Sequence, residues 1–208
     1  MPVEVQESDV ASISKVGIDL GLKDLATCSD GTKVAMPRFA RKTEEKIATA
    51  QRAKKKRQVK SLHAKVASQR KDYLHKASSK ISKEHGLIVI GDVSSSKLAK
   101  TWMAKSVLDA GWADLKNMLS YKSMRNGGAM IQVSEAYSSQ VCSCCGCRPA
   151  SAPRGVKDLG KRVWRCDECG SEHDRDVNAA RNILRVGLDT LVAGAPKEGR
   201  NPFLQGGE

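Results

Sequence analysis

The chain has 208 residues and a formal net charge of +13 at neutral pH, with 36 lysines and arginines against 23 aspartates and glutamates. This length is enough for one well-sized hydrophobic core and a small appended unit. The composition argues against a membrane protein, because no run approaches the roughly 18 apolar residues of a spanning helix. The polar N-terminus, MPVEVQESDV, has no secretory signal pattern, so we expect a soluble, basic protein of the cytosol.

The opening part of the chain predicts three short antiparallel strands. Residues 1–11 are polar and are expected to form a tail or a linker stub. The first strand ends in Asp19 and is broken by Gly21, while Asp30-Gly31 is a dipeptide typical of type I′ hairpins. The strands are expected over residues 13–19, 25–29 and 32–35.

Two long helical stretches follow, at about residues 41–60 and 61–85, and they carry most of the positive charge. Between Arg41 and Lys83 there are 15 lysines and arginines against 3 acidic residues. A solvated helical face is one explanation of such a run. Its length and single sign favour contact with nucleic-acid phosphates, which would relieve the self-repulsion. The candidate phosphate-binding residues are Lys54, Lys55, Lys56, Arg57, Lys60, Arg70 and Lys71.

The rest of the chain alternates between strand and helix. Residues 87–90 are wholly apolar and rich in β-branched side chains, which is typical of a strand buried on both faces. A helix over about 105–122 and a strand over 129–133 follow, and Glu135 comes just after that strand. A last helix is expected over about 177–186, and the Gly- and Pro-rich residues 188–208 are expected to form a flexible tail.

This order of elements predicts an α/β fold of the RNase H-like (RuvC) class, a mixed sheet with helices plus a small inserted zinc ribbon. In such a fold the first strand is central, and the fourth and fifth strands lie parallel beside it. The carboxyl ends of these strands therefore share one edge of the sheet. Acidic residues at that edge, with one more on the last helix, can hold two divalent metal ions about 4 Å apart.

The inserted unit is indicated by two CxxC pairs, each followed by glycine. CxxC places two thiolates on one turn, so the two pairs supply the sulfurs of a closed, tetrahedral, structural zinc site. Seven cysteines in a chain of this kind indicate metal binding in a reducing compartment rather than disulfides. The predicted ligands are Cys142, Cys145, Cys166 and Cys169. Cys147 is an alternative ligand, Cys144 a bystander and Cys28 a buried strand residue.

Six segments together resemble the TnpB family, transposon-encoded relatives of the type V CRISPR nucleases. They are GIDLGLKDLAT, QRKDYLHK, LIVIGDV, YSSQVCSCCG, WRCDECG and HDRDVNAARNIL. The resemblance covers about residues 12–187 and implies a RuvC-like domain over 12–140 and 173–187, with the zinc ribbon at 141–172. It also implies a protein of the bacterial cytosol or nucleoid that binds guide RNA and target DNA and cuts the DNA at one RuvC site with two Mg²⁺ or Mn²⁺ ions.

The resemblance also assigns residues. Asp19 in GIDLG matches the first catalytic aspartate of the family, and Asp176 in DRDVNAA matches the last, with Asp174 as a stand-in. The four CxxC cysteines match the family's zinc ligands. No phosphate-binding loop of the Walker type is present, so ATP use is not expected.

Two features depart from the family pattern. The family has glutamate after its fourth strand, where this chain has Gly91, which cannot bind a metal. Glu135 ends the fifth strand, and because parallel strands lie about 4.8 Å apart, its side chain can recover the vacated position. Asp92 is one residue off and should point to the other face. The family's N-terminal half, a β-barrel and a helical lobe that grip guide RNA, is also absent.

These departures leave three hypotheses. The first is a working endonuclease in which Glu135 replaces the glutamate. The second is a nuclease-inactive, RNA-guided DNA binder. The third is a truncated zinc-containing nucleic-acid-binding module that needs a missing N-terminal half or a partner polypeptide.

Several further residues have local interpretations. Trp112 is expected in the core and Trp164 in the ribbon's small core, while Trp102 in a polar loop is a candidate for base stacking. Arg181 either approaches the catalytic site or makes a surface salt bridge. The ribbon residues Lys161, Arg162 and Arg165 could add phosphate contacts.

Overall fold

The computed structural model describes residues 14–93, 104–154, 158 and 160–193. Its centre is a five-stranded sheet with the strand order β3-β2-β1-β4-β5. Three antiparallel strands come first, namely β1 (Lys15–Leu20), β2 (Asp24–Cys28) and β3 (Lys33–Ala35), and β4 (Leu87–Gly91) and β5 (Ala129–Val133) run parallel to β1. The predicted mixed α/β arrangement, with the first strand central, is confirmed.

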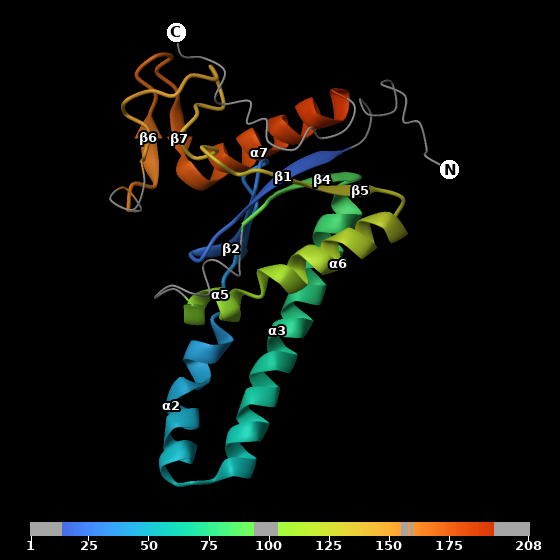
Figure 1. Cartoon of the computed structure of the whole chain (residues 1–208), viewed down its shortest axis with the longest axis vertical. Coiled ribbons are helices and arrows are strands. Elements are labelled where there is room, and N and C mark those ends of the chain that lie inside the picture. Colours follow the sequence, from blue (N-terminus) through green and yellow to red (C-terminus); the bar gives the residue numbers. More distant parts are fainter. Residues whose placement is uncertain (1–13, 94–103, 155–157, 159, 194–208) are drawn as a thin grey trace.

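The apolar residues of β4 divide between the two faces of the sheet. Ile88 and Ile90 belong to a core shared with α3 (Lys56–Glu84) and α6 (Trp112–Arg125), and Trp112 is buried there as expected. Leu87 and Val89 face the opposite side, where they pack against α7 (Arg175–Val192). The sheet is therefore covered by helices on both faces (Figure 1). This double burial explains why β4 has no alternation of polar and apolar residues.

Helix α7 lies unusually close to the sheet at two glycines. A Cβ atom on Gly17 of β1 would lie 2.1 Å from the carbonyl oxygen of Ala180, and one on Gly187 would lie 2.4 Å from Cγ1 of Val89. The expected helix end before Gly187 is therefore wrong, because the helix continues to Val192, over residues 188–192 that were expected to belong to the tail. Gly187 serves close packing here and not termination.

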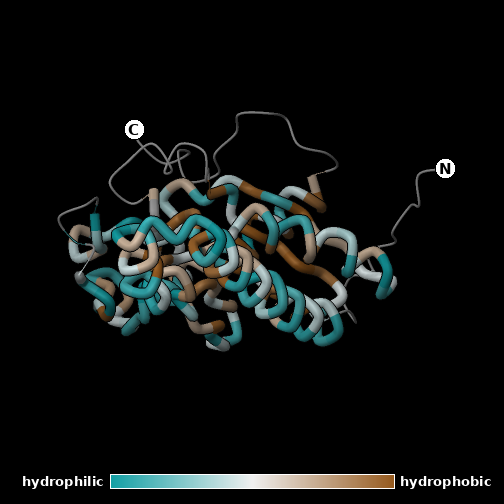
Figure 2. The backbone as a smooth tube through the Cα atoms, turned by 90° about the horizontal axis from the view of Figure 1, so that it is seen from below, coloured by the Kyte–Doolittle hydropathy of each residue, from teal (hydrophilic) through white to brown (hydrophobic). Residues whose placement is uncertain are grey.

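The helical region that carries the positive charge forms a projecting arm. Helix α2 (Phe39–Arg52) and α3 extend side by side away from the sheet (Figure 1). The turn between them contains Lys54 at a φ of 55°, so the break falls at residues 53–55 and not at 60 as expected. Seen from below, the helices nearest the viewer are largely hydrophilic and the hydrophobic segments lie behind them (Figure 2).

A second helix break separates α5 (Ala104–Ala110) from α6, where a single helix was expected. Gly111 between them adopts a left-handed backbone with a φ of 66°, which glycine tolerates at little cost. Asp109, two residues before Gly111, is buried and accepts a hydrogen bond from the backbone N–H of Ala40 at the start of α2.

Trp102, the candidate for base stacking, lies outside the described residues.

Arg70 is part of the same junction. Its guanidinium Nη2 lies 3.0 Å from Oδ1 of Asp109, so this predicted phosphate-binding residue has an ion-pair partner within the chain. Asp109 thereby joins α2, α3 and α5 at the base of the arm.

None of the helices in the described part of the chain has the length and apolar composition needed to cross a membrane.

We expect the substitution Asp109→Ala to lower the free energy of unfolding by about 2–3 kcal/mol, because it leaves the partly buried Arg70 unpaired. Urea denaturation of the purified chain measures this. Asp72→Ala is the matched control, since Asp72 pairs with Lys76 four residues on and both side chains are mostly exposed; its effect should stay within about 0.5 kcal/mol. Equal losses in the two variants would contradict the junction's role.

Candidate active site and metal centre

Three carboxylates from three separate elements line one cleft. Asp19 lies near the end of β1, Glu135 follows β5, and Asp176 is in the first turn of α7. The cleft has a volume of about 400 Å³, and its wall also contains Lys23, Arg162 and Arg175. The structure thus brings together the three predicted catalytic residues. They approach because β1 and β5 run parallel to β4 and end at the same edge of the sheet.

Asp19 is the carboxylate whose ionisation the cleft opposes most clearly. Burial raises the pKa of Asp19 well above its usual value, and the nearby carboxylates of Glu135 and Asp176 raise it further. Arg175 and Arg162 act in the opposite direction. A buried carboxyl whose pKa is raised further by neighbouring carboxylates is one whose ionised form a bound cation would stabilise.

Glu135 fills the space beside Gly91. A Cβ atom built on Gly91 would lie 3.2 Å from both Cβ and Oε2 of Glu135. The carboxylate of Glu135 therefore lies directly over the backbone position at which the resemblance calls for a glutamate. Burial raises the pKa of Glu135. The positive charge of Lys116 lowers this pKa, and the negative charge of Asp92 raises it.

Asp92 is not among the residues that line the cleft. Its Oδ1 lies 3.3 Å from Nζ of Lys116, and the side chain is 66% exposed. The Nζ of Lys116 also donates to the carbonyl oxygen of Val93 at 3.2 Å. Asp92 is thus paired with a lysine and does not line the cleft with the three carboxylates.

Asp174 and Asp176 have different tasks at the start of α7. Oδ1 of Asp174 accepts hydrogen bonds from the backbone N–H groups of Asp176, at 3.0 Å, and Val177, at 3.1 Å. Asp174 is therefore the N-cap of the helix, and its other oxygen pairs with Lys33 at 2.7 Å. Asp176 instead faces Arg162, whose Nη1 lies 3.2 Å from Oδ2.

Arg162 occupies the position of a counter-ion in this cleft. The guanidinium neutralises Asp176, and the backbone carbonyl of Arg162 accepts a hydrogen bond from the N–H of Arg175 at 2.7 Å.

Among the described residues, the oxygens of the three carboxylates do not all lie within 4.8 Å of one another. Arg175 carries no sequence signal other than its place between two aspartates, so reasoning from the sequence missed it.

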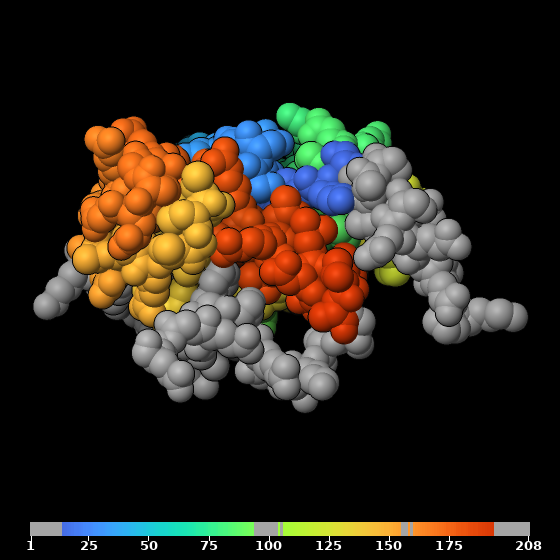
Figure 3. Space-filling model, turned by 90° about the horizontal axis from the view of Figure 1, so that it is seen from above, coloured from blue at the N-terminus to red at the C-terminus, as the bar shows by residue number. Residues whose placement is uncertain are grey.

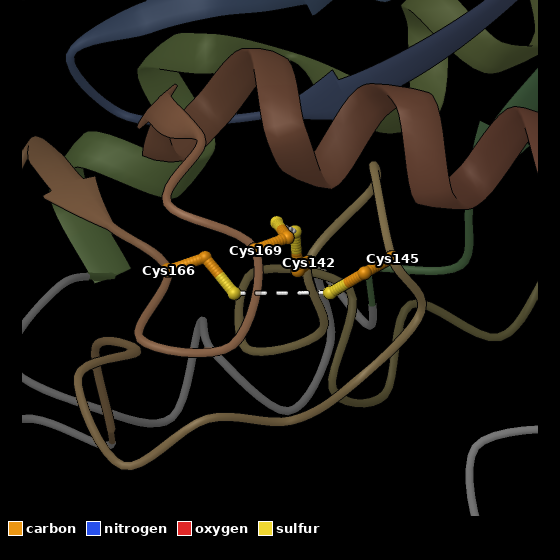
Figure 4. Close-up of side chains that lie close together, drawn as sticks. All are labelled: Cys142, Cys145, Cys166 and Cys169. Carbon is orange, nitrogen blue, oxygen red and sulfur yellow. Dashed lines mark hydrogen bonds between the residues drawn. The ribbon is translucent and has the colours of Figure 1, made fainter.

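The four predicted zinc ligands form one cluster. The ligand atoms of Cys142, Cys145, Cys166 and Cys169 all lie within 4.8 Å of one another (Figure 4). The Sγ atoms of Cys145 and Cys166 are 3.8 Å apart, and those of Cys142 and Cys169 are 3.7 Å apart. Four convergent thiols are the donor set of a closed structural zinc site, so the residues fit that metal.

The two CxxC turns have the same backbone geometry. Gly146 and Gly170 follow the pairs at φ values of 77° and 73°. Their N–H groups donate to the carbonyls of Cys142 and Cys166, each at 2.9 Å. Positive φ is a conformation that glycine adopts readily, which explains the glycine after each pair. Cys144 and Cys147 are exposed, and neither belongs to the cluster.

A small core supports the cysteine cluster. The two-stranded hairpin of β6 (Val163–Arg165) and β7 (Glu172–Asp174) places Trp164 against His173, with ring centroids 4.7 Å apart. Nε2 of His173 lies 3.0 Å from Sγ of Cys142. Trp164 is buried together with Cys142 and Cys166, as expected for the ribbon's core. The ribbon packs beside α7 (Figure 3).

The turn between α2 and α3, where most of the predicted phosphate-binding lysines lie, is at the end of the arm far from the sheet (Figure 1), whereas Lys71 lies midway along α3. Lys55, Lys56 and Arg57 line a shallow surface depression at the turn between α2 and α3. Lys54, Lys60 and Lys71 are also exposed. Nε of Arg181 donates to the backbone carbonyl of Ser29 at 3.3 Å, and Arg181 is not among the described residues that line the cleft.

Comparison with known proteins gives a consistent result. Residues 1–101 match a family model described as a probable transposase, OrfB_IS605, and residues 112–183 match the Cas12f1-like TNB domain. The chain is similar to a candidate RNA-guided DNA endonuclease of Streptomyces pristinaespiralis, with 37% identity over 198 residues. That match covers 88% of this chain and 48% of the relative.

A second candidate RNA-guided DNA endonuclease, InsQ of Escherichia coli strain K12, is 35% identical over 222 residues, covering 93% of this chain and 54% of the relative. The chain therefore spans about half the length of these curated relatives. Among solved structures, a Cas12f1–sgRNA–target DNA complex matches with a TM-score of 0.65 and 19% identity, over 88% of this chain and 51% of that one. This likeness shows a shared fold.

We expect Cys145→Ser to abolish zinc binding and Cys147→Ser to leave it intact, although both side chains are exposed. Only the first removes a sulfur from the cluster. Metal content of the purified variants, measured by inductively coupled plasma mass spectrometry, tests this. Loss of zinc in the Cys147 variant, or its retention in the Cys145 variant, would show that the ligand set is different.

Proposed function

Because the chain belongs to the TnpB family, we propose that it provides the nuclease site of an RNA-guided DNA endonuclease, with Asp19, Glu135 and Asp176 as the catalytic carboxylates. The observation that carries this proposal is the position of Glu135. Its carboxylate lies 3.2 Å from where a Cβ of Gly91 would be, so the chain retains an acid at the place where the family's glutamate is missing.

The three carboxylates suit two Mg²⁺ or Mn²⁺ ions, which prefer oxygen ligands. Bound there, such ions would activate water and stabilise the leaving oxygen of the cleaved phosphodiester. Binding would also relieve the electrostatic strain that raises the pKa of Asp19. Asp174 would not take part, because its oxygens cap α7 and pair with Lys33.

The cationic residues of the cleft would bind the substrate. Arg162 pairs with Asp176 in the structure, and Arg175 lines the same cleft. Once divalent cations neutralise the carboxylates, both guanidinium groups are available for the phosphates that flank the scissile bond. Arginine suits this role because its planar fork matches two phosphate oxygens.

We also propose that the exposed cations of the arm turn contact nucleic-acid backbone. Such contacts carry no sequence information, which fits a protein whose target is read by guide pairing. The matched Cas12f1 structure contains an sgRNA and a target DNA, which supports both as partners of this chain.

A nuclease-inactive, RNA-guided DNA binder is the second candidate function, and Gly91 is the observation that favours it. If the carboxylate of Glu135 cannot replace the lost glutamate, the remaining acids would bind divalent metal poorly. The protein would then act by occupying DNA.

We expect Mg²⁺-dependent cleavage of labelled DNA by the purified chain, assayed with co-purified RNA and with the complementary half of the protein supplied as a separate polypeptide. Asp19→Ala and Glu135→Gln should each slow cleavage by more than about 100-fold, since even partners of metal ligands contribute 10–100-fold. Asp92→Asn is the matched control and should retain most activity, because Asp92 does not line the cleft and pairs with Lys116.

Full activity in Glu135→Gln would rule out the proposed replacement of the glutamate. Tight binding of DNA without cleavage by the unmodified chain would establish the second candidate instead. Neither cleavage nor RNA-dependent binding would leave a zinc-containing module that binds nucleic acid non-specifically.

The arm turn has its own test. Replacing Lys54, Lys55 and Lys56 by glutamine should weaken nucleic-acid binding and reduce the salt dependence, by about 2 to 3 in the slope of log affinity against log salt. The control replaces Lys76, Lys80 and Lys83, which are exposed on α3 nearer the sheet and change the net charge equally. Fluorescence anisotropy at several salt concentrations measures both, and equal losses would argue against a binding site at the turn.

A further inference from the structure

Two asparagines on the inner side of α7 have no role in the site described so far. Asn178 and Asn182 lie one helical turn apart, and each is 1% exposed. Burying an amide is unfavourable unless its hydrogen bonds are made inside the protein. The partners of these two side chains therefore indicate why asparagine is present.

Both side-chain amides donate hydrogen bonds to the same short segment. Nδ2 of Asn178 donates to the carbonyls of Ser138 and Val141 at 3.3 and 2.8 Å. Nδ2 of Asn182 donates to the same two carbonyls at 2.8 and 2.7 Å. The N–H of Ser138 in turn donates to the carbonyl of Glu135 at 3.0 Å. The turn that follows Glu135 is thus fixed to the helix that carries Asp176.

Asn178 also reaches the cysteine cluster. Its Oδ1 accepts a hydrogen bond at 2.9 Å from the N–H of Ser143, which lies between Cys142 and Cys145. Val141, whose carbonyl both asparagines bind, directly precedes Cys142. One side chain therefore contacts the first CxxC turn and the turn after Glu135, from a position two residues beyond Asp176.

The choice of asparagine is informative at position 182. Its Oδ1 is buried and has no hydrogen-bond partner within the described part of the chain. An unsatisfied buried acceptor costs about 1–3 kcal/mol, so a residue without it would be favoured if packing alone mattered. The two N–H donors are what this position provides.

We propose that Asn178 and Asn182 are positioning residues that couple zinc binding in the ribbon to divalent-metal binding in the carboxylate cleft. The inference rests on the proposed function for the cleft but not for the ribbon. Zinc fixes Cys142 and Cys145, Asn178 transmits that constraint to α7, and both asparagines hold the turn after Glu135 against it. Because coupling between two binding sites is reciprocal, each metal strengthens the binding of the other.

The test uses the full, zinc-loaded chain and two measurements. The rate of zinc transfer to a chromogenic chelator reports on the ribbon, and Mn²⁺ affinity from electron paramagnetic resonance reports on the cleft. Asn178→Ala should release zinc about tenfold faster or more, the effect expected for partners of metal ligands. It should also weaken Mn²⁺ binding. In the unmodified chain, removing zinc should weaken Mn²⁺ binding to a similar extent.

Asn126→Ala is the matched control, since Nδ2 of Asn126 donates to the carbonyl of Ser82 at 2.9 Å but touches neither site. It should lower the melting temperature without changing zinc release or Mn²⁺ affinity. If Asn178→Ala does not fold, Asn182→Leu replaces it, because leucine fills the space without donors. Its Mn²⁺ affinity should fall in the same way.

Zinc release no faster in the asparagine variants than in Asn126→Ala would overturn the proposal. So would unchanged Mn²⁺ affinity, provided that Asp19→Ala abolishes the Mn²⁺ signal. If Asp19→Ala leaves that signal unchanged, the proposed carboxylate site is wrong, and with it the coupling. The zinc measurement alone then still shows whether Asn178 supports the ribbon.

Discussion

The approach of α7 to the sheet is the constraint on which the rest of the structure depends. It requires bare backbone at two points, Gly17 on β1 and Gly187 on the helix, because a Cβ atom at either would overlap its neighbour. The apolar contacts of Ile183 and Val186 with Val89 then follow on the same side. This short separation brings the first turn of α7, and Asp176 with it, to the edge of the sheet at which Asp19 lies. A larger side chain at Gly17 would move the helix and separate the two acids.

The same helix also determines how the ribbon is attached. The ribbon's second strand runs directly into α7, with Asp174 as its N-cap. The first CxxC turn is held from the helix through Asn178. The ribbon is therefore attached to α7 near its beginning, at the first CxxC turn, and at its end, at β7, and it restrains the position of that helix. Its sulfur cluster, small core and hydrogen bonds help to hold α7 beside the cleft, although none of the four clustered cysteines lines the cleft.

Much of this was accessible from the sequence because the signals are local. The CxxC pairs, the hairpin dipeptide and the apolar run of β4 each depend on neighbouring residues. The approach of Asp19, Glu135 and Asp176 could be predicted because the order of the elements indicates which strand ends share an edge. Individual contacts with distant partners were not predicted. The sequence around Gly187 indicates a helix end unless Val89 is known to lie against it, and nothing local indicates that Arg70 pairs with Asp109. The buried asparagines could have been noticed, since two amides spaced by one turn on an apolar helix face need partners.

The register of the sheet explains why Glu135 lies beside Gly91. In the parallel pair β4 and β5, Gly91 lies opposite Val133. Val133 packs with Val89 on the face toward α7. Side chains two residues apart along an extended chain share a face, so Glu135 follows Val133 toward the cleft. Asp92 instead lies 3.3 Å from Nζ of Lys116 and does not line the cleft. Because Gly91 has no side chain, there is room beside it for the side chain of Glu135.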